Sequence, residues 1–258
     1  MRKYCTAIAL SAGQGRRMGA SVQKQYMELG GRPVIYYALK TFEDSGIIDD
    51  IILVVGEGQE EDVRCRIVEK YSITKVRAIV SGGKERYDSV WRGLQAMTRQ
   101  DGYVFIHDGA RPFVDEAMLR RGYETVEKYG ACVAGMPSKD TVKLADDAGI
   151  AKETPERKYV WVVQTPQIFE TALITEAYSR LLGKESGLSG GRRQEQARAA
   201  GGRDWHINVT DDAMVAEQMM NAKVKLFEGS YENIKITTPE DIDIARMFLH
   251  RKNENVGN

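Results

Sequence analysis

Hydrophobic and polar positions follow two repeating patterns in the first half of the chain. Short runs of β-branched and other apolar residues, typical of buried strands, occupy 6–10, 51–55, 76–80, 103–106 and 131–136. Segments with apolar residues at helical spacing lie between several of these runs, at about 34–42, 60–70 and 90–97. This repeated strand–helix–strand order predicts an α/β fold, with a mostly parallel twisted sheet and helices on both of its faces.

The pattern changes after residue 137. Between about 137 and 162 polar and apolar residues alternate, and 146–149 has the composition of a turn, so we expect a protruding β-arm. A helix at about 170–182 should lead into a flexible loop at about 183–206, where Gly, Arg, Gln and Ser dominate. A helix at about 211–220, a strand at 224–227 and a final helix from Pro239 would complete a single domain, 1–258.

The overall composition excludes several classes of protein. Lys plus Arg and Asp plus Glu are equal at 37 each, so the net charge gives no support for binding nucleic acid or a membrane. No apolar run approaches the roughly 20 residues of a membrane helix. The three cysteines form no CxxC pair, which is typical of a reduced, cytoplasmic protein. Any site for an anion must therefore come from a local group of cations.

A glycine-rich segment follows the first predicted strand, a place where α/β proteins bind ligands. Gly13 and Gly15 would allow backbone N–H groups to approach phosphate oxygens, and Arg17 and Lys24 come shortly after them. Met18 stands where a dinucleotide fingerprint needs its third glycine, and the chain contains no Gly-x4-Gly-Lys-Ser/Thr P-loop. The segment suits a triphosphate, and the alternative is a tight turn with solvated basic residues.

Two later predicted strands also end in polar groups or glycine. Gly82 and Gly83 follow the third strand, where close backbone approach suits a planar base and Ser89 can hydrogen-bond it. A simple turn before a helix is the alternative. Asp108 ends the fourth strand, where a carboxylate is well placed to hold Mg²⁺, although it could instead cap a loop. We expect the neighbouring His107 to be structural.

Taken together, these motifs resemble the 2-C-methyl-D-erythritol 4-phosphate cytidylyltransferase family. The resemblance runs nearly from end to end, through segments that agree in order and spacing: 13–18 with 24–26 and 33–35, then 82–90, 107–112, 140–143, 163–167, 210–213 and 233–241. The chain departs from the family pattern at Ser11, Gln23 and Ser138, where alanine, proline and valine are usual. Its Gly/Arg-rich segment is also longer than the family normally carries.

The resemblance implies a Rossmann-like nucleotidyltransferase fold and the transfer of CMP from CTP to 2-C-methyl-D-erythritol 4-phosphate, with release of pyrophosphate. This reaction belongs to isoprenoid biosynthesis by the non-mevalonate pathway. Mg²⁺ is the implied cofactor, and a homodimer formed through the β-arms is the implied assembly. A ribitol-5-phosphate cytidylyltransferase is the nearest alternative, and a non-catalytic nucleotide-binding regulator is an alternative from another class.

The resemblance also assigns roles to individual residues. The nucleotide would contact Ala12, Gly13, Gly15, Gly82, Gly83, Ser89 and Asp108. The catalytic cations would be Arg17, Lys24 and Lys235, the last in a strand-like run at 233–237 where a solvated lysine is the ordinary alternative. The polyol phosphate would contact Arg111 and, from the arm of the partner subunit, Thr141 and Arg157. Mg²⁺ would be held by Asp108 and Asp211, although Asp211 also suits a helix N-cap.

Overall fold

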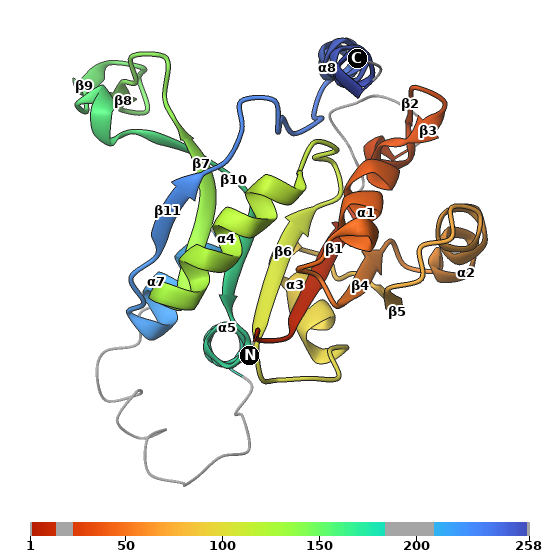
Figure 1. The fold of residues 1–258 in the computed structure, drawn as a ribbon. Coiled ribbons are helices and arrows are strands. Elements are labelled where there is room, and N and C mark those ends of the chain that lie inside the picture. The colour runs from red at the N-terminus through yellow and green to blue at the C-terminus, as the bar shows by residue number, and fades with distance from the viewer. Residues whose placement is uncertain (1, 14–22, 184–208, 257–258) are drawn as a thin grey trace, which may run out of the picture.

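A seven-stranded sheet forms the centre of the computed structural model, which describes residues 2–13, 23–183 and 209–256 (Figure 1). In sheet order its strands are β11 (Lys225–Glu228), β7 (Ala131–Pro137), β10 (Trp161–Glu170), β6 (Tyr103–Asp108), β1 (Cys5–Ser11), β4 (Asp50–Val55) and β5 (Val76–Ser81). All neighbouring pairs are parallel except the two that β10 makes with β6 and β7. The predicted α/β fold with a mostly parallel sheet is confirmed.

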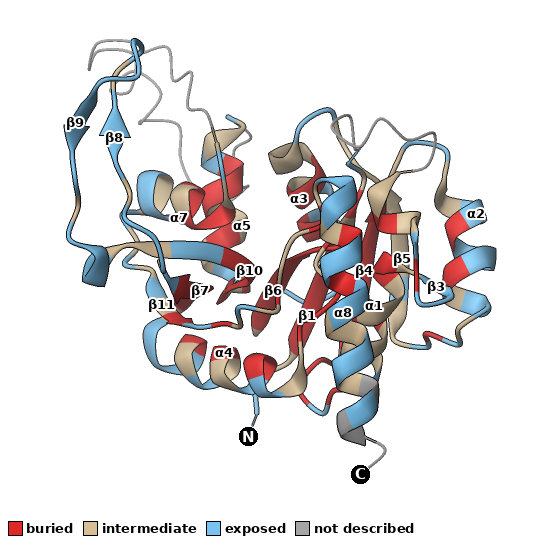
Figure 2. Ribbon diagram, turned by 90° about the horizontal axis from the view of Figure 1, so that it is seen from above, coloured by how far each residue is buried: buried red, intermediate tan, exposed pale blue. Residues whose placement is uncertain are grey.

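Helices cover both faces of the sheet (Figure 2). One face packs against α1 (Val34–Asp44) and α4 (Glu116–Tyr129), and the other against α3 (Arg86–Gln95), α5 (Thr171–Leu181) and α7 (Asp212–Met220). The helix ends follow local chemistry, as in α4. Asp115 accepts a hydrogen bond from the Met118 backbone N–H at the start of α4, and Gly130 ends this helix at φ 74°.

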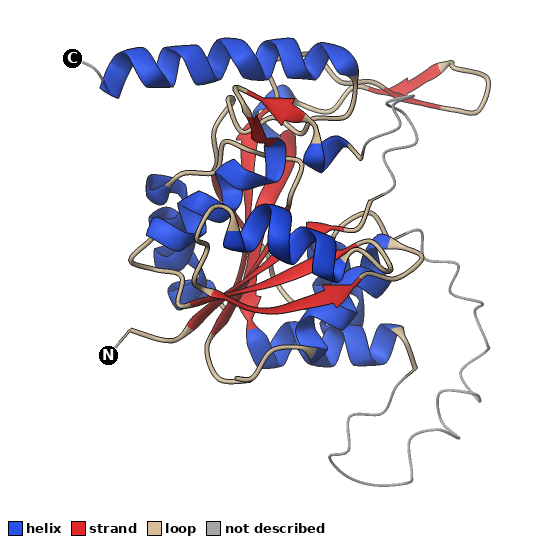
Figure 3. Ribbon diagram, turned by 90° about the vertical axis from the view of Figure 1, so that its right-hand side faces the viewer, coloured by secondary structure: helices blue, strands red, loops and turns tan. Residues whose placement is uncertain are grey.

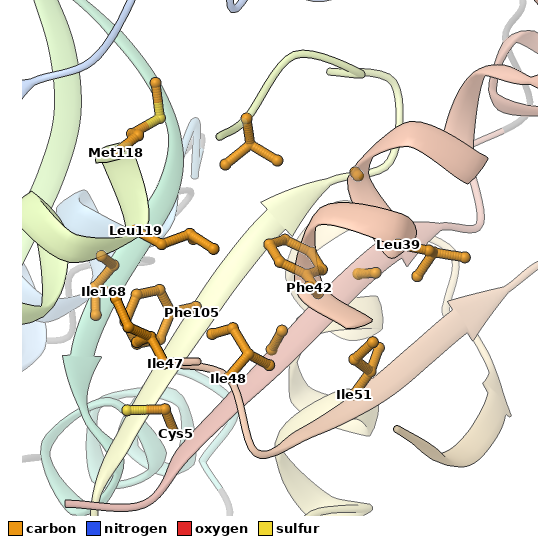
Figure 4. Packing of buried hydrophobic residues seen from close by; sticks show 14 of the residues in the cluster. Cys5, Leu39, Phe42, Ile47, Ile48, Ile51, Phe105, Met118, Leu119 and Ile168 are labelled. Carbon is orange, nitrogen blue, oxygen red and sulfur yellow. The ribbon is translucent and has the colours of Figure 1, made fainter. Parts of the chain in front are cut away.

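Alternating residues of the buried strands supply two separate cores. Phe105 of β6 points toward α1 and α4, where it packs near Phe42, Leu119 and Ile168 (Figure 4). Its neighbour Ile106 belongs to the opposite core, which α3, α5 and α7 cover. Because side chains alternate along a strand, a sheet buried on both faces needs the continuous apolar runs seen in the sequence.

The last helix, α8 (Pro239–Val256), lies at the end of the sheet where the parallel strands have their carboxyl ends (Figures 1 and 3). Its residues Ile242 and Ala245 are buried in a third apolar cluster with Leu29 and Phe113, and its Leu249 packs against this cluster. Short strands β2 (Glu28–Leu29) and β3 (Arg32–Pro33) lie nearby. Across the described residues, no helix is both long and apolar enough to cross a membrane.

A two-stranded antiparallel ribbon projects from the sheet between β7 and β10 (Figures 1 and 2). It consists of β8 (Leu144–Ala145) and β9 (Ala151–Glu153), followed by the short helical turn η4 (Arg157–Tyr159). We call residues 138–160 the arm. Three of its large apolar residues are exposed to solvent, Leu144 by 49%, Ile150 by 65% and Tyr159 by 73%.

Three segments differ from the sequence-based expectations. β10 is a full strand of the central sheet that the sequence pattern did not predict. The pattern is mixed because residues near the start of the strand are exposed, whereas the six before Glu170 are buried. The strand-like run at 233–237 is irregular chain, held by bonds such as Ile236 N–H to the Ala110 carbonyl. The expected helix at 60–70 divides into α2 (Glu60–Val63) and the π-helical η3 (Arg64–Glu69).

Candidate active site

A cavity of about 950 Å³ opens at the carboxyl ends of β1, β4, β5 and β6. Eight of the described residues that line this cavity were predicted to bind the nucleotide or to act as catalytic cations: Ala12, Gly13, Lys24, Gly82, Gly83, Ser89, Asp108 and Lys235. They come from segments more than 200 residues apart, and the fold brings them to one edge of the sheet. This is the edge at which open α/β sheets bind their ligands.

The remaining predicted residues are not among the described residues that line this cavity. Gly15 and Arg17 fall outside the described residues, as does nearly all of the loop expected at 183–206. Arg111 follows the cavity residue Ala110, and its Nη1 donates to the Asn233 carbonyl at 2.7 Å. Thr141 and Arg157 are exposed on the arm and do not line this cavity. Their proposed contact with substrate therefore requires a site other than the cavity of their own chain.

The start of the glycine-rich segment is held by Gln25, a residue for which the sequence suggested no role. Its buried side chain donates from Nε2 to the carbonyls of Ser11 at 2.7 Å and Gly13 at 2.8 Å. The Ser11 hydroxyl also donates to the Tyr26 hydroxyl at 2.8 Å. These bonds tie the turn η2 (Lys24–Tyr26) to the end of β1, and so bring Lys24 to the cavity.

Close backbone approach explains both glycines after β5. A Cβ atom at Gly82 would lie 2.2 Å from the Cβ of Ala12, and one at Gly83 would lie 2.2 Å from the Cβ of Asp88. Ser89 supports the same turn, because its Oγ accepts from the Gly83 N–H at 3.0 Å and lies 3.2 Å from the Glu85 carbonyl. Both glycines are therefore required by packing within the protein, and their backbone lines the cavity beside Ser89.

A chain of alternating charges runs from one wall of the cavity into the protein. Asp108 Oδ2 lies 2.7 Å from Lys235 Nζ, and its Oδ1 lies 3.4 Å from Arg86 Nε. Arg86 in turn donates from Nη1 and Nη2 to the two carboxylate oxygens of Asp212, each at 2.8 Å. Asp212 is fully buried. The sequence predicted neither the pairing of Asp108 with Lys235 and Arg86 nor its extension to the buried Asp212.

This pairing fixes the charge of the central carboxylate. Burial alone would raise the pKa of Asp108, but Arg86 and Lys235 hold that pKa well below its usual range. Burial alone would likewise lower the pKa of Arg86, but Asp212 and Asp108 raise it above its ordinary value. Asp108 and Arg86 are consequently ionised at neutral pH.

His107 acts as a support beneath this wall. Its Nε2 lies 3.0 Å from the Arg111 carbonyl, and its Nδ1 lies 3.0 Å from Oγ1 of Thr165. Burial lowers the pKa of His107 to about 4, so the imidazole is neutral at pH 7. Thr165 also accepts from the Asp108 backbone N–H at 3.0 Å, which fixes the end of β6. These contacts agree with a structural histidine.

The two carboxylates expected to hold Mg²⁺ differ in their fit to that ion. Asp108 lines the cavity, where substrate phosphates and waters could complete the coordination of the ion, and its two oxygens also contact Lys235 and Arg86. Asp211 is the N-cap of α7: its oxygens accept from the Met214 N–H and from Gln167 Nε2, each at 3.0 Å. Within the described ranges, no three His, Cys, Asp or Glu residues gather as a metal site. The assignment of Asp211 stays a prediction that this arrangement does not favour.

Comparison with known proteins identifies the family. The model of the family described as IspD, 2-C-methyl-D-erythritol 4-phosphate cytidylyltransferase, matches residues 5–251. The chain belongs to this family. A family member of that name from Lachnospira eligens is 48% identical over 244 residues, covering 95% of this chain and 98% of the relative. Another, from Alkaliphilus oremlandii, is 40% identical over 249 residues and covers 96% of each chain.

Solved structures of the family have the same fold. The crystal structure of 4-diphosphocytidyl-2C-methyl-D-erythritol synthase from Anaerococcus prevotii superimposes with a TM-score of 0.77 at 36% identity, over 96% of each chain. The cytidylyltransferase from Thermus thermophilus gives a TM-score of 0.66 at 26% identity. The Rossmann-like nucleotidyltransferase fold expected from the sequence is confirmed by these neighbours.

Proposed function

We propose that the protein transfers CMP from CTP to 2-C-methyl-D-erythritol 4-phosphate, in isoprenoid biosynthesis by the non-mevalonate pathway. The observation that carries this proposal is the cavity at the strand ends, which is lined by Lys24, Lys235 and Asp108 together with Gly82, Gly83 and Ser89. Membership of the cytidylyltransferase family supports the same assignment. A cytoplasmic location is part of the proposal.

The chemistry follows from the charges around the cavity. A phosphate oxygen of the substrate attacks the α-phosphorus of CTP, and the bond from this phosphorus to the pyrophosphate oxygen breaks. Negative charge develops on the phosphate oxygens during this step, and fixed cations stabilise it. Lys24 and Lys235 line the cavity in which that charge would lie. We assign Arg17 to the same task from its place in the sequence.

We infer that Asp108 would hold Mg²⁺ together with the phosphates of CTP. Bound Mg²⁺ would neutralise part of the charge on the phosphate oxygens. The protein's own contribution is a carboxylate kept ionised and held by Lys235 and Arg86 at the end of a rigid strand.

The arm supports the proposal of a homodimer. Thr141 and Arg157 are exposed there, and Leu144, Ile150 and Tyr159 expose apolar surface that a second copy of the chain could cover. In such a dimer, the arm of one subunit would supply Thr141 and Arg157 to the polyol phosphate in the cavity of the other.

Mixed dimers test the contribution of the arm. Arg157→Ala and Lys235→Met are each expected to be nearly inactive alone, and co-expression of the two should restore pyrophosphate release. Activity returns because a mixed dimer has one site that carries both changes and one site that carries neither. The matched control combines Lys235→Met with Asp108→Asn, which line the same cavity of one chain, and should restore nothing. If co-expression of Arg157→Ala with Lys235→Met restored no activity, the proposal that the arm contributes to the partner's site would be contradicted.

The deciding experiment for the proposed function measures pyrophosphate release with CTP and Mg²⁺. We expect release with 2-C-methyl-D-erythritol 4-phosphate and little with ribitol 5-phosphate. Release with ribitol 5-phosphate alone would support cytidylyl transfer as the reaction, but with ribitol 5-phosphate as the substrate in place of 2-C-methyl-D-erythritol 4-phosphate. Silence with both polyol phosphates, while CTP still binds, would instead indicate a nucleotide-binding regulator.

A further inference from the structure

A chain of hydrogen bonds, buried at its inner end, runs from helix α5 to the wall of the cavity. The Tyr178 hydroxyl donates to Oδ1 of Asp212 at 2.5 Å, and both oxygens of Asp212 accept from the terminal nitrogens of Arg86 at 2.8 Å. The remaining nitrogen of Arg86, Nε, lies 3.4 Å from Oδ1 of Asp108. Residues of α5, α7 and α3 are thereby connected to the end of β6.

Asp212 is fixed on all sides. Its side chain is fully buried, and its backbone N–H donates to Oε1 of Gln167 at 2.9 Å, as does the N–H of Ala213. A buried carboxylate without partners is strongly unfavourable, so the forked contact with Arg86 is strongly favoured over an open arrangement. Tyr178 is also buried and adds a hydroxyl donor to the same carboxylate.

The direction of the Arg86 guanidinium follows from this contact. The group is planar, and its two terminal nitrogens form a fork that matches a carboxylate. With this fork engaged by Asp212, the Nε edge faces Asp108. Lys235 holds the other oxygen of Asp108 at 2.7 Å. The carboxylate in the cavity wall is therefore held between two cations, and the protein interior orients one of them.

We propose that Asp212 and Tyr178 are positioning residues of the transfer reaction, which orient Arg86 so that it and Lys235 hold the Asp108 carboxylate in one place. Neither Asp212 nor Tyr178 is among the described residues that line the cavity, so they act through Arg86 and not on the substrate. This inference rests on the proposed function, because it concerns the geometry of that site.

Removal of one hydroxyl tests the proposal with little disturbance of the core. Tyr178→Phe is expected to lower kcat by about tenfold with KM for CTP changed by less than about twofold, since misplacement of reacting groups by ~1 Å can reduce rates up to ~100-fold. Tyr4→Phe is the matched control. Its hydroxyl donates to the buried Asp50 at 3.1 Å, at the opposite end of the sheet. This control should lose similar thermal stability and keep the kcat of the unchanged protein.

A second variant tests whether the chain of contacts acts as one unit. Arg86→Lys keeps the positive charge, but an ammonium has no fork with which to bridge two carboxylates. If Tyr178 acts through Arg86, adding Tyr178→Phe to Arg86→Lys should lower kcat little further. The proposal would be overturned if the reductions in kcat caused by Tyr178→Phe and Arg86→Lys multiplied in the double variant. It would also be overturned if Tyr178→Phe had the same kcat as Tyr4→Phe. An unchanged protein that releases no pyrophosphate would instead overturn the proposed function, and this inference with it.

Discussion

Replacement of Lys235 with methionine is expected to lower kcat by about a hundredfold or more, the effect of removing one preorganised group that stabilises developing charge. The Lys235 ammonium reaches the cavity and lies 2.7 Å from Oδ2 of Asp108, while 36% of its side chain is exposed. Methionine keeps most of the length and removes the charge, so the fold should persist. Steady-state pyrophosphate release gives kcat, and thermal unfolding monitors the fold.

Lys40→Met is the matched control for this experiment. Lys40 forms a similar pair with Asp44 at 2.6 Å, on the exposed side of α1 and away from the cavity. Exposed pairs of this kind contribute little to stability, so both kcat and thermal stability should stay close to those of the unchanged protein. Equal kcat values for Lys235→Met and Lys40→Met would show that Lys235 is not a catalytic cation.

Replacement of Asp108 with asparagine is the second change with a large expected effect. The amide keeps the shape of the carboxylate but loses the charge that Lys235 and Arg86 surround. We expect kcat to fall by about a hundredfold or more, and the Mg²⁺ concentration for half-maximal rate to rise, because a neutral oxygen is a poorer ligand for a hard cation.

A titration of rate against Mg²⁺ at saturating CTP measures both quantities. Asp44→Asn, which changes the carboxylate of the exposed Lys40 pair, is the control and should leave the titration unchanged. A titration midpoint that does not move in Asp108→Asn would show that the carboxylate only supports the wall. In that case another oxygen ligand would have to replace it in the proposed site.

Much of the fold was predictable because strands buried on both faces of a sheet appear in the sequence as continuous apolar runs. The strands β1, β4, β5, β6 and β7 agree with their predicted runs to within a residue or two at each end. β10 was not predicted because its character changes along its length. Val162 is 58% exposed beside the arm, whereas Ile168 and Phe169 are fully buried in the sheet. A strand that serves two environments lacks the single periodicity on which sequence interpretation depends.

The position of the site was predictable, but its internal pairing was not. Loops after parallel strands meet at one edge, so Ala12, Gly82 and Asp108 could be placed together from their order alone. The contact between Arg86 and Asp212 joins residues 126 positions apart and depends on how α3 and α7 pack. Nothing in the local sequence distinguishes Asp212 from its neighbour Asp211, which is the N-cap of the same helix.

The antiparallel strand β10 limits how this protein can change in evolution. It starts at the base of the arm and continues to Thr165, whose hydroxyl supports the backbone of Asp108. Insertion or deletion of one residue in a strand moves every following side chain to the opposite face. A change in the length of β10 would therefore displace the arm and the cavity wall together. The turn at 146–149, whose residues 147–149 are exposed, has no link to the cavity wall, so variation in length between relatives should accumulate at the tip of the arm.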